Sequence, residues 1–322
     1  MTSFITTANA TEIKTKESRR QAGSPLKFKK ITLADIPQIN RILQDSTSRT
    51  CDCTVGGIFM WIDYFDYSYC IYRDTLFIKG VSELYPDKTA FSLPLGKMDI
   101  AHAIGMLKEY CMQNNIELRF SAIPEDRLEE FRSVGLTDTE QLVDWGDYLY
   151  DIEKLATLSG KKMSKKRNHV NRFEAENEGY RLEPLTPDRV HRLKVDYDSW
   201  LSPEDLDRPT AIEEHRQVVN VLDNLLCYPF EGLILLDGSG RAVAFTLGVV
   251  IGDTLFVHIE KMRHDVAGAG ETINKSFARY MLDRHPGLRF ANREEDTGDP
   301  GLRKAKKSYH PEMILRKYDI IV

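Results

Sequence analysis

The feature that most constrains the fold is an order of predicted elements that occurs twice along the chain. Hydrophobic periodicity and turn residues predict the first copy as strand, helix, antiparallel meander, helix, strand and helix, over residues 27–33, 35–44, 68–95, 99–111, 117–122 and 125–134. The second copy has the same order with one additional helix, over residues 180–185, 187–200, 212–226, 233–259, 273–280, 288–292 and 301–308. A last strand is predicted over 313–321. The tripeptide Leu118-Arg119-Phe120 recurs as Leu288-Arg289-Phe290 at the corresponding place, 288 − 118 = 170 residues later.

This duplicated order predicts an α+β protein with two domains of the same type. Each domain is expected to have a mixed, mainly antiparallel sheet flanked by helices. We place the first domain at residues 26–150 and the second, which carries the candidate site, at residues 151–322. Residues 1–25 are polar and rich in Thr, which is typical of a flexible tail.

Overall charge and cysteine spacing exclude several classes of protein. The chain has 44 Lys and Arg residues against 49 Asp and Glu, a net charge of −5, whereas general nucleic-acid coat proteins are basic overall. No apolar run approaches the roughly 18–20 residues that span a bilayer, and the first residues lack the apolar core of a signal peptide. The cysteines have no spacing typical of a zinc site. We therefore expect a cytoplasmic protein with no bound metal.

A basic stretch over residues 161–172 is the first candidate binding site. Half of its twelve residues are Lys or Arg, and the residues we single out are Lys161, Lys165, Lys166, Arg167 and Asn168. Such a concentration on an acidic protein favours binding of phosphate groups. The alternative is a solvated helix face or a linker, which is what runs of charge usually form.

An acidic loop over residues 292–299 leads into a second basic segment. The loop begins at Asn292, at the predicted end of a strand, and contains Glu295 and Asp296. Because adjacent carboxylates repel one another, one of them is expected to have a raised pKa and to act as a general base. Arg303 and Lys306 follow and could position a carboxylate or phosphate. The alternative is an ordinary acidic loop paired with these basic residues.

A glycine turn at Gly268 and Gly270 is a weaker candidate site. Its backbone N–H groups could bind an anion at the start of a helix, but the strand before it belongs to a meander, which argues against a dinucleotide fold. His258 and Lys261 lie near the end of that strand. His258 is either a general base or a core histidine with satisfied hydrogen bonds. The common hydrolase, NTPase and zinc-protease motifs are absent from the sequence, which favours direct transfer between two bound substrates.

Two motifs resemble those of a known family. They are Leu158-x-Gly160-Lys161-Lys162 leading to Lys166-Arg167-Asn168, and Asn292-x-Glu294-Glu295-Asp296-x-Gly298-x-x-Gly301-Leu302-Arg303-x-x-Lys306-x-Ser308-Tyr309-x-Pro311. They are similar to the soluble C-terminal part of bacterial phosphatidylglycerol lysyltransferases and, more closely, to uncharacterised soluble bacterial proteins related to them. The resemblance covers residues 25–322 and implies two tandem GNAT-like (acyl-CoA N-acyltransferase) domains, as in the Fem-type peptidyltransferases.

The resemblance implies an aminoacyl-tRNA donor and a lipid hydroxyl or cell-wall amine as acceptor. Acyl-CoA enzymes of this fold place Arg or Gln at the position before the glycine turn where this chain has Asp265, an anion that would repel pyrophosphate. Acyl-CoA is therefore the less favoured donor, and we expect no tightly bound cofactor.

The sequence thus leaves two hypotheses. The first is a transferase that moves an aminoacyl or acyl group onto an amine or hydroxyl of a small molecule, lipid head group or cell-wall precursor. The second is a non-catalytic module that binds tRNA or another anion.

Overall fold

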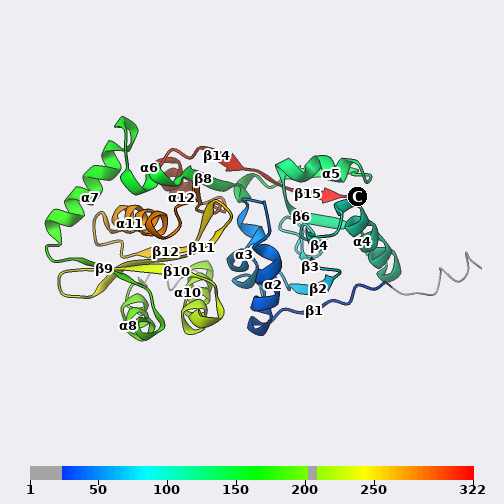
Figure 1. Ribbon diagram of the computed structural model, residues 1–322, viewed down its shortest axis with the longest axis horizontal. Coiled ribbons are helices and arrows are strands. Elements are labelled where there is room, and N and C mark those ends of the chain that lie inside the picture. Colours follow the sequence, from blue (N-terminus) through cyan, green and yellow to red (C-terminus); the bar gives the residue numbers. More distant parts are fainter. Residues whose placement is uncertain (1–23, 202–208) are drawn as a thin grey trace, which may run out of the picture.

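The computed structural model describes residues 24–201 and 209–322, which form two sheets with helices packed against them (Figure 1). The predicted α+β class with mixed, mainly antiparallel sheets is confirmed. The tail predicted over residues 1–25 lies, except for its last two residues, outside the described residues.

The first sheet has eight strands, ordered β1-β2-β3-β4-β6-β15-β7 with β5 also paired to β3. All of its pairs are antiparallel except β4 with β6. Within the meander predicted over residues 68–95, β2 and β3 form a hairpin that turns at Arg73 and Asp74, whose φ values of 49° and 55° suit a tight hairpin turn. The strands are β1 (Lys29–Lys30), β2 (Ser68–Tyr72), β3 (Thr75–Val81), β4 (Thr89–Phe91), β5 (Leu95–Gly96), β6 (Arg119–Pro124), β7 (Asp138–Gln141) and β15 (Lys317–Ile321).

The second sheet has seven strands, ordered β14-β8-β13-β12-β11-β10-β9. It repeats the plan of the first, because a three-stranded antiparallel meander is followed by one parallel pair, here β12 with β13. The strands are β8 (Asp147–Asp151), β9 (Arg181–Pro184), β10 (Glu231–Leu236), β11 (Ala242–Ile251), β12 (Thr254–Met262), β13 (Phe290–Asn292) and β14 (Met313–Leu315).

The two sheets exchange strands. β8 follows the first half of the chain but pairs with β13 and β14, whereas β15 follows the second half but lies between β6 and β7. Figure 1 shows β15, in red, entering the sheet formed by the blue and cyan segments. The prediction of one final strand over 313–321 is therefore wrong: it is two strands, in different sheets, on either side of Arg316. The domain limits 26–150 and 151–322 stay predictions.

Helices cover both faces of the second sheet. α11 packs on one face, and α8 and α10 lie on the other (Figure 1). The α-helices are α2 (Ile36–Leu43), α3 (Val55–Phe59), α4 (Ile100–Asn114), α5 (Leu128–Arg132), α6 (Ile152–Thr157), α7 (Ser164–Glu176), α8 (Pro187–Asp198), α10 (Pro209–Asp223), α11 (Ala269–Arg284) and α12 (Pro300–Lys307). Short 3₁₀ turns include η2 (Cys51–Cys53), η4 (Val143–Trp145) and η5 (Lys161–Met163). None of the described helices is both long and apolar enough to cross a bilayer.

Two large apolar cores hold these layers together. One contains Phe120 of the first sheet and continues through the other half of the chain to Val221 and Phe245. The second lies under α11, where Phe277 packs with Leu235. The first core includes residues from both halves of the chain, so the two sheets share one apolar core. Polar groups that lie between the sheets are therefore shielded from water.

Candidate functional site

A buried cluster of charged side chains joins the two sheets. At its centre is Lys317 of β15, whose side chain is only 2% exposed. Its ammonium lies 2.7 Å from Oδ1 of Asp147 on β8 and 2.6 Å from Oδ2 of Asp52 in η2. It also lies 3.3 Å from Sγ of Cys51 and 3.7 Å from Oε2 of Glu295. The cluster thus draws on four segments that are far apart in the sequence.

Asn292, one of the predicted binding residues, holds this cluster to the end of β13. Its fully buried amide donates to Oδ2 of Asp147 (2.7 Å) and to the carbonyl of Arg49 (2.7 Å). Its side-chain oxygen accepts from the backbone N–H of Glu294 (2.7 Å), and the N–H of Cys51 donates to Asp147 (2.7 Å). These contacts fix the start of the acidic loop against the first half of the chain.

Glu295 is the acidic residue of the loop that faces the cluster. Burial, together with the charges of Asp147 and Glu294, raises its pKa to about 8, although the nearby Lys317 opposes the shift. The sequence predicted a raised pKa in this triplet from mutual repulsion, whereas the larger cause is burial. A carboxylate with a pKa near the working pH is suited to accept a proton, and this role for Glu295 stays a prediction.

His258 lies beside the cluster and has both ring nitrogens in hydrogen bonds. Nδ1 is 2.7 Å from Oε1 of Glu294, and Nε2 is 3.2 Å from Oγ1 of Thr54. A Cβ on Gly56 of α3 would lie 2.3 Å from the ring, so only glycine permits this close approach. The contacts favour the core-histidine alternative, in which His258 positions Glu294 and joins the two halves.

Asp296, the other predicted catalytic carboxylate, is engaged by basic and hydroxyl groups. Arg303 forms a two-point contact with it, at 2.9 and 2.6 Å, and the Tyr148 hydroxyl donates to it at 2.6 Å. Burial alone would raise the pKa of Asp296, but these hydrogen bonds lower it to about 2. Arg303 also bonds Asp144 of η4 (2.6 Å). This arrangement favours a role in holding the loop.

Lys306 of α12 also supports the acidic loop. Its side chain is directed inward, and the residue is 8% exposed. The ammonium donates to the backbone carbonyl of Arg293 (2.5 Å) and to that of Glu295. Burial lowers its pKa. Lys306 thus fixes the backbone that carries Glu295, rather than facing a solvent-exposed phosphate.

The predicted phosphate-binding residues divide into two groups. Lys161, Lys165 and Asn168, on η5 and α7, are exposed. Lys166 instead pairs with Glu271 of α11 (3.1 Å) and lies 4.0 Å from the centre of the Tyr309 ring. Arg167 donates to the carbonyls of Leu158 and Gly160, beyond the end of α6. The exposed residues are therefore the ones available to a ligand.

The turn at Gly268 and Gly270 packs against α7, the helix of the basic stretch. Gly268 has φ of 80°, and a Cβ there would lie 2.2 Å from the carbonyl oxygen of His169. A Cβ on Gly270 would meet the Met262 side chain at 2.7 Å. Lys261 pairs with Glu214 of α10. Gly268 thus allows close packing of α11 on α7, and Gly270 allows close packing of α11 on β12. Their predicted role in binding an anion stays untested.

Sequence reasoning missed Lys317, Asp147, Asp52 and Cys51. One signal was present, because Lys317 and Asp319 alternate with Tyr318 and Ile320, which places two charged residues on one face of a predicted strand. Charged residues at buried strand positions are unusual unless they are paired.

The cluster contains three groups that could in principle bind a metal ion. Sγ of Cys51 and carboxylate oxygens of Asp147 and Glu295 lie within 4.8 Å of one another. The Lys317 ammonium, however, lies 2.7–3.7 Å from all three. Because a cation already fills the space between these ligands, the residues do not fit a resident metal, and no chemical step is assigned to one.

Comparison with known proteins identifies relatives over nearly the whole chain. The family model described as phosphatidylglycerol lysyltransferase, C-terminal, matches residues 44–321. A curated relative, an uncharacterised protein of Mycoplasmoides gallisepticum, is 24% identical over 173 residues, which are 53% of this chain. The match spans about half (54%) of that relative's length.

Three solved structures are similar. A conserved protein of unknown function from Bacteroides thetaiotaomicron is 30% identical, with a TM-score of 0.84, over 92% of this chain and 99% of that one. L-PGS from Bacillus licheniformis is 14% identical with a TM-score of 0.62, over 88% and 91% of the two chains. FemX is 10% identical with a TM-score of 0.51, over 92% and 98%. The last two show the fold alone, and with them the expected tandem GNAT-like architecture is confirmed.

Proposed function

We propose, since the chain belongs to the phosphatidylglycerol lysyltransferase C-terminal family, that it transfers an aminoacyl group from an aminoacyl-tRNA to an amine or hydroxyl acceptor. The donor is the one that the family resemblance implies. The observation that carries the proposal is Glu295, a carboxylate that is only 14% exposed and lies beside a charged cluster, with a pKa raised to about 8.

Glu295 would act as the general base. In this reaction the acceptor nitrogen or oxygen attacks the ester carbonyl carbon of the donor, and the proton that the nucleophile loses passes to Glu295. The bond to the ribose oxygen of the tRNA breaks, and that oxygen takes up a proton. Lys317 and Asn292 hold the loop so that the Glu295 carboxylate keeps its position, since a well-placed base contributes typically about 10²–10⁴-fold to the rate.

The exposed lysines of the basic stretch over residues 161–172 would bind the donor. Lys161 and Lys165 are available for phosphate contacts, and each contact would release counterions and make binding sensitive to salt. The glycine turn supports an aminoacyl-tRNA donor over acyl-CoA. The arginine near this turn, Arg263, makes a two-point contact with Asp265 at 3.0 and 2.5 Å. Because it is paired with a carboxylate, its charge is not available to the phosphates of acyl-CoA.

The test is single-turnover aminoacyl transfer by Glu295→Gln. We expect a rate about 10²–10⁴-fold lower than that of the unchanged protein. The rise in rate with pH that centres near pH 8 should also disappear. Glu312→Gln is the matched control, because Glu312 is partly exposed and pairs with Lys154 on α6. Unchanged rate and pH profile in Glu295→Gln would remove Glu295 from the mechanism.

The alternative is a tRNA-binding module without catalysis. It is favoured by one observation: the contacts of Asp296 and Lys306 hold the loop, whereas Lys161 and Lys165 remain exposed. Lys161→Ala should weaken tRNA binding and reduce the salt slope by about one for one lost phosphate contact. Salt-dependent binding of charged tRNA with no transfer to amine, lipid or cell-wall acceptors would support this alternative over the transferase.

A further inference from the structure

His258 is a buried histidine to which the proposed function gives no role. Its side chain is fully buried and lies at a bulge in β12, where the register with β11 shifts between Leu247 and Gly248. Bulges redirect a side chain out of the regular alternation of a strand. The ring of His258 packs against Gly56 of α3 and so lies between polar groups from the two halves of the chain.

One of these polar groups is the Thr54 hydroxyl, and its only proton is already used. Oγ1 donates to the carbonyl of Cys51 at 2.7 Å, accepts from the N–H of Gly57 at 3.0 Å and lies 3.2 Å from Nε2 of His258. A hydroxyl has one proton to donate. Because the shorter contact, with the carbonyl, takes that proton, Nε2 must donate to Oγ1. The ring therefore carries a proton on Nε2.

The other polar group, the Glu294 carboxylate, requires a second proton. Nδ1 of His258 lies 2.7 Å from Oε1 of Glu294, a normal hydrogen-bond length. A neutral ring with its proton on Nε2 has only a lone pair on Nδ1, and an ionised carboxylate has no proton to give. Two acceptors would repel each other at this distance, so one more proton lies between them. Imidazole is ordinarily more basic than a carboxylate, which places that proton on Nδ1.

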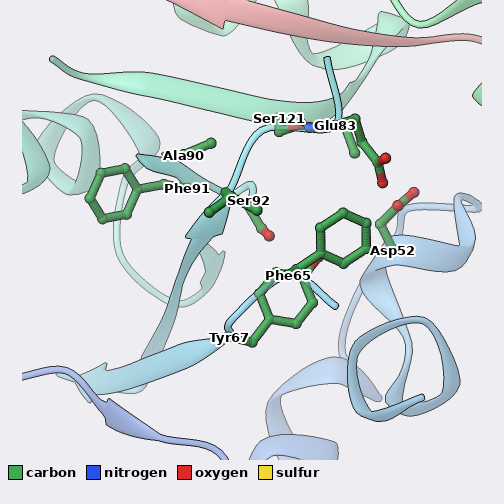
Figure 2. Close-up of a pocket in the computed structure, with 10 residues that line it drawn as sticks. Asp52, Phe65, Tyr67, Glu83, Ala90, Phe91, Ser92 and Ser121 are labelled. Atoms are coloured by element: carbon green, nitrogen blue, oxygen red, sulfur yellow. Dashed lines mark hydrogen bonds between the residues drawn. The ribbon is translucent and has the colours of Figure 1, made fainter. Parts of the chain in front are cut away.

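A positive charge on this ring matters because acidic groups surround the candidate base, Glu295. The charged and titratable groups that face Glu295 are Cys51 and Asp52 of η2, Asp147 of β8, Glu294 of the same loop, Lys306 of α12 and Lys317 of β15. Figure 2 shows that Asp52 in turn lies close to a further carboxylate, that of Glu83. Burial is the largest cause of the raised pKa of Glu295, Lys317 opposes it, and the negative charge of Glu294 adds to it.

We propose that His258 is a charged positioning residue of the site: as an imidazolium it fixes the Glu294 carboxylate and balances its charge, so that Glu294 repels a negative charge on the neighbouring Glu295 less. His258 acts through Glu294, and its role is therefore positioning and not catalytic. The link to Glu295 as a base rests on the proposed function, whereas the protonation state of the ring does not.

The surroundings of the ring suit a charged histidine. The Glu294 carboxylate offsets the cost of burying the cation, as is required of a buried charge. The ring centre of Phe230 lies 5.4 Å from that of His258, and aromatic rings attract cations at such distances. The Glu294 side chain itself is 24% exposed, so the ion pair extends from the buried ring to the surface of the acidic loop.

The protonation state can be measured on the full chain by nitrogen NMR with labelled histidine. The His258 signal can be assigned through contacts of its ring with the rings of Phe230 and Phe256. We expect both ring nitrogens to carry a proton at pH 7. In Glu294→Gln the proton on Nδ1 should be lost, because no carboxylate balances it, and Nε2 should keep its own. A ring with a single proton in the unchanged protein, on either nitrogen, would overturn the proposal.

The effect on the base can be measured by single-turnover transfer as a function of pH. In the unchanged protein the rate should rise around pH 8, where Glu295 loses its proton. His258→Gln leaves the charge of Glu294 unbalanced, so this midpoint should move up by about one pH unit and the rate at pH 7 should fall about tenfold. Adding Glu294→Gln removes that charge and should return the midpoint to about pH 8 or below. A role confined to packing would lower the rate without moving the midpoint.

His285→Gln is the matched control, because His285 also contacts a glutamate, Glu231, but lies at the end of α11 and is 34% exposed. It should leave the midpoint unchanged. An unmoved midpoint in His258→Gln, or one that stays raised when Glu294→Gln is added, would overturn the proposal.

The two measurements separate this inference from the proposed function. If His258→Gln does not fold, the NMR measurement on the unchanged protein still decides. If the unchanged protein transfers no aminoacyl group, the proposed function fails, and the protons found on the ring decide the inference by themselves. Transfer by a protein whose His258 ring carries one proton would refute this inference alone.

Discussion

Replacing Lys317 by Met should destabilise the protein strongly, because it removes the buried cation and leaves its partners. Met has a similar length and apolar character, so the change removes the charge with little loss of volume. The ammonium contacts Asp52, Asp147 and Cys51 at 2.6, 2.7 and 3.3 Å, which uses all three of its N–H donors. Breaking a buried ion pair by removing one partner typically costs about 3–5 kcal/mol.

At about 2 °C per kcal/mol for a chain larger than a small domain, this corresponds to a melting temperature lower by about 6–10 °C. The measurement is thermal and urea unfolding at pH 7. Lys154→Met is the matched control, since Lys154 also contacts two carboxylates, those of Asp151 and Glu312, but is 52% exposed. Exposed ion pairs contribute little, and this control should melt close to the unchanged protein.

The pH dependence gives a second criterion. Burial alone would raise the pKa of Asp147, but Lys317 lowers it in the folded protein. Without Lys317 the folded state should take up a proton there more readily, so the destabilisation should shrink as the pH falls from 7 to 4. A loss below about 1 kcal/mol at pH 7, well under the expected range, would refute the reasoning, as would a loss that is independent of pH.

Three further predictions concern other parts of the structure. Gly268→Ala should lower the unfolding free energy by more than Gly252→Ala, because both have positive φ but only the former would press a Cβ against a backbone oxygen at 2.2 Å. The latter should cost about 1 kcal/mol, and equal losses in urea unfolding would contradict the packing argument. Tyr148→Phe should cost about 1–2 kcal/mol at pH 7 through its lost bond to Asp296. Because the folded pKa of Asp296 is lowered to about 2, that loss should fade as the pH drops through this value, and a loss constant down to pH 2 would count against it. Glu83 has its pKa raised from 4.5 to about 9, so the folded state holds its proton more tightly and stability should fall as the pH rises between these values. Glu83→Gln should flatten this part of the stability profile, and parallel profiles for the two proteins would show that Glu83 does not titrate as described.

The sequence predicted elements well where local chemistry determines them. The hairpin at Arg73 and Asp74 lies in the meander predicted over residues 68–95, where two residues separate two β-prone runs. Asp99 was expected to begin a helix, and its side chain accepts from the N–H of His102. The split of the final strand at Arg316 could not be predicted, since no local feature distinguishes the partners of β14 from those of β15.

The candidate site was predicted in part for the same reason. The acidic loop with Glu295 is contiguous in sequence, so its density of charge was visible. The rest of the cluster is not contiguous: Cys51 and Lys317 are 266 residues apart, and only the exchanged strand β15 brings them together. The contacts of Lys306 and Arg167 with backbone carbonyls could not be predicted from the sequence either, because nothing in a charged run shows which basic side chain points inward.

The exchange of β8 and β15 has a consequence for how the protein is made. In the described structure β7 pairs only with β15, and β6 has β15 as one of its two neighbours. During synthesis from the N-terminus, the first sheet must therefore wait, incomplete, until residues 317–321 have left the ribosome. The second sheet receives β8 early, but its edge strand β14, residues 313–315, is also made late. The half of the chain that is translated first is thus completed by residues 317–321, which are translated after both halves, and the arrival of Lys317 among Asp52 and Asp147 is the step that closes it.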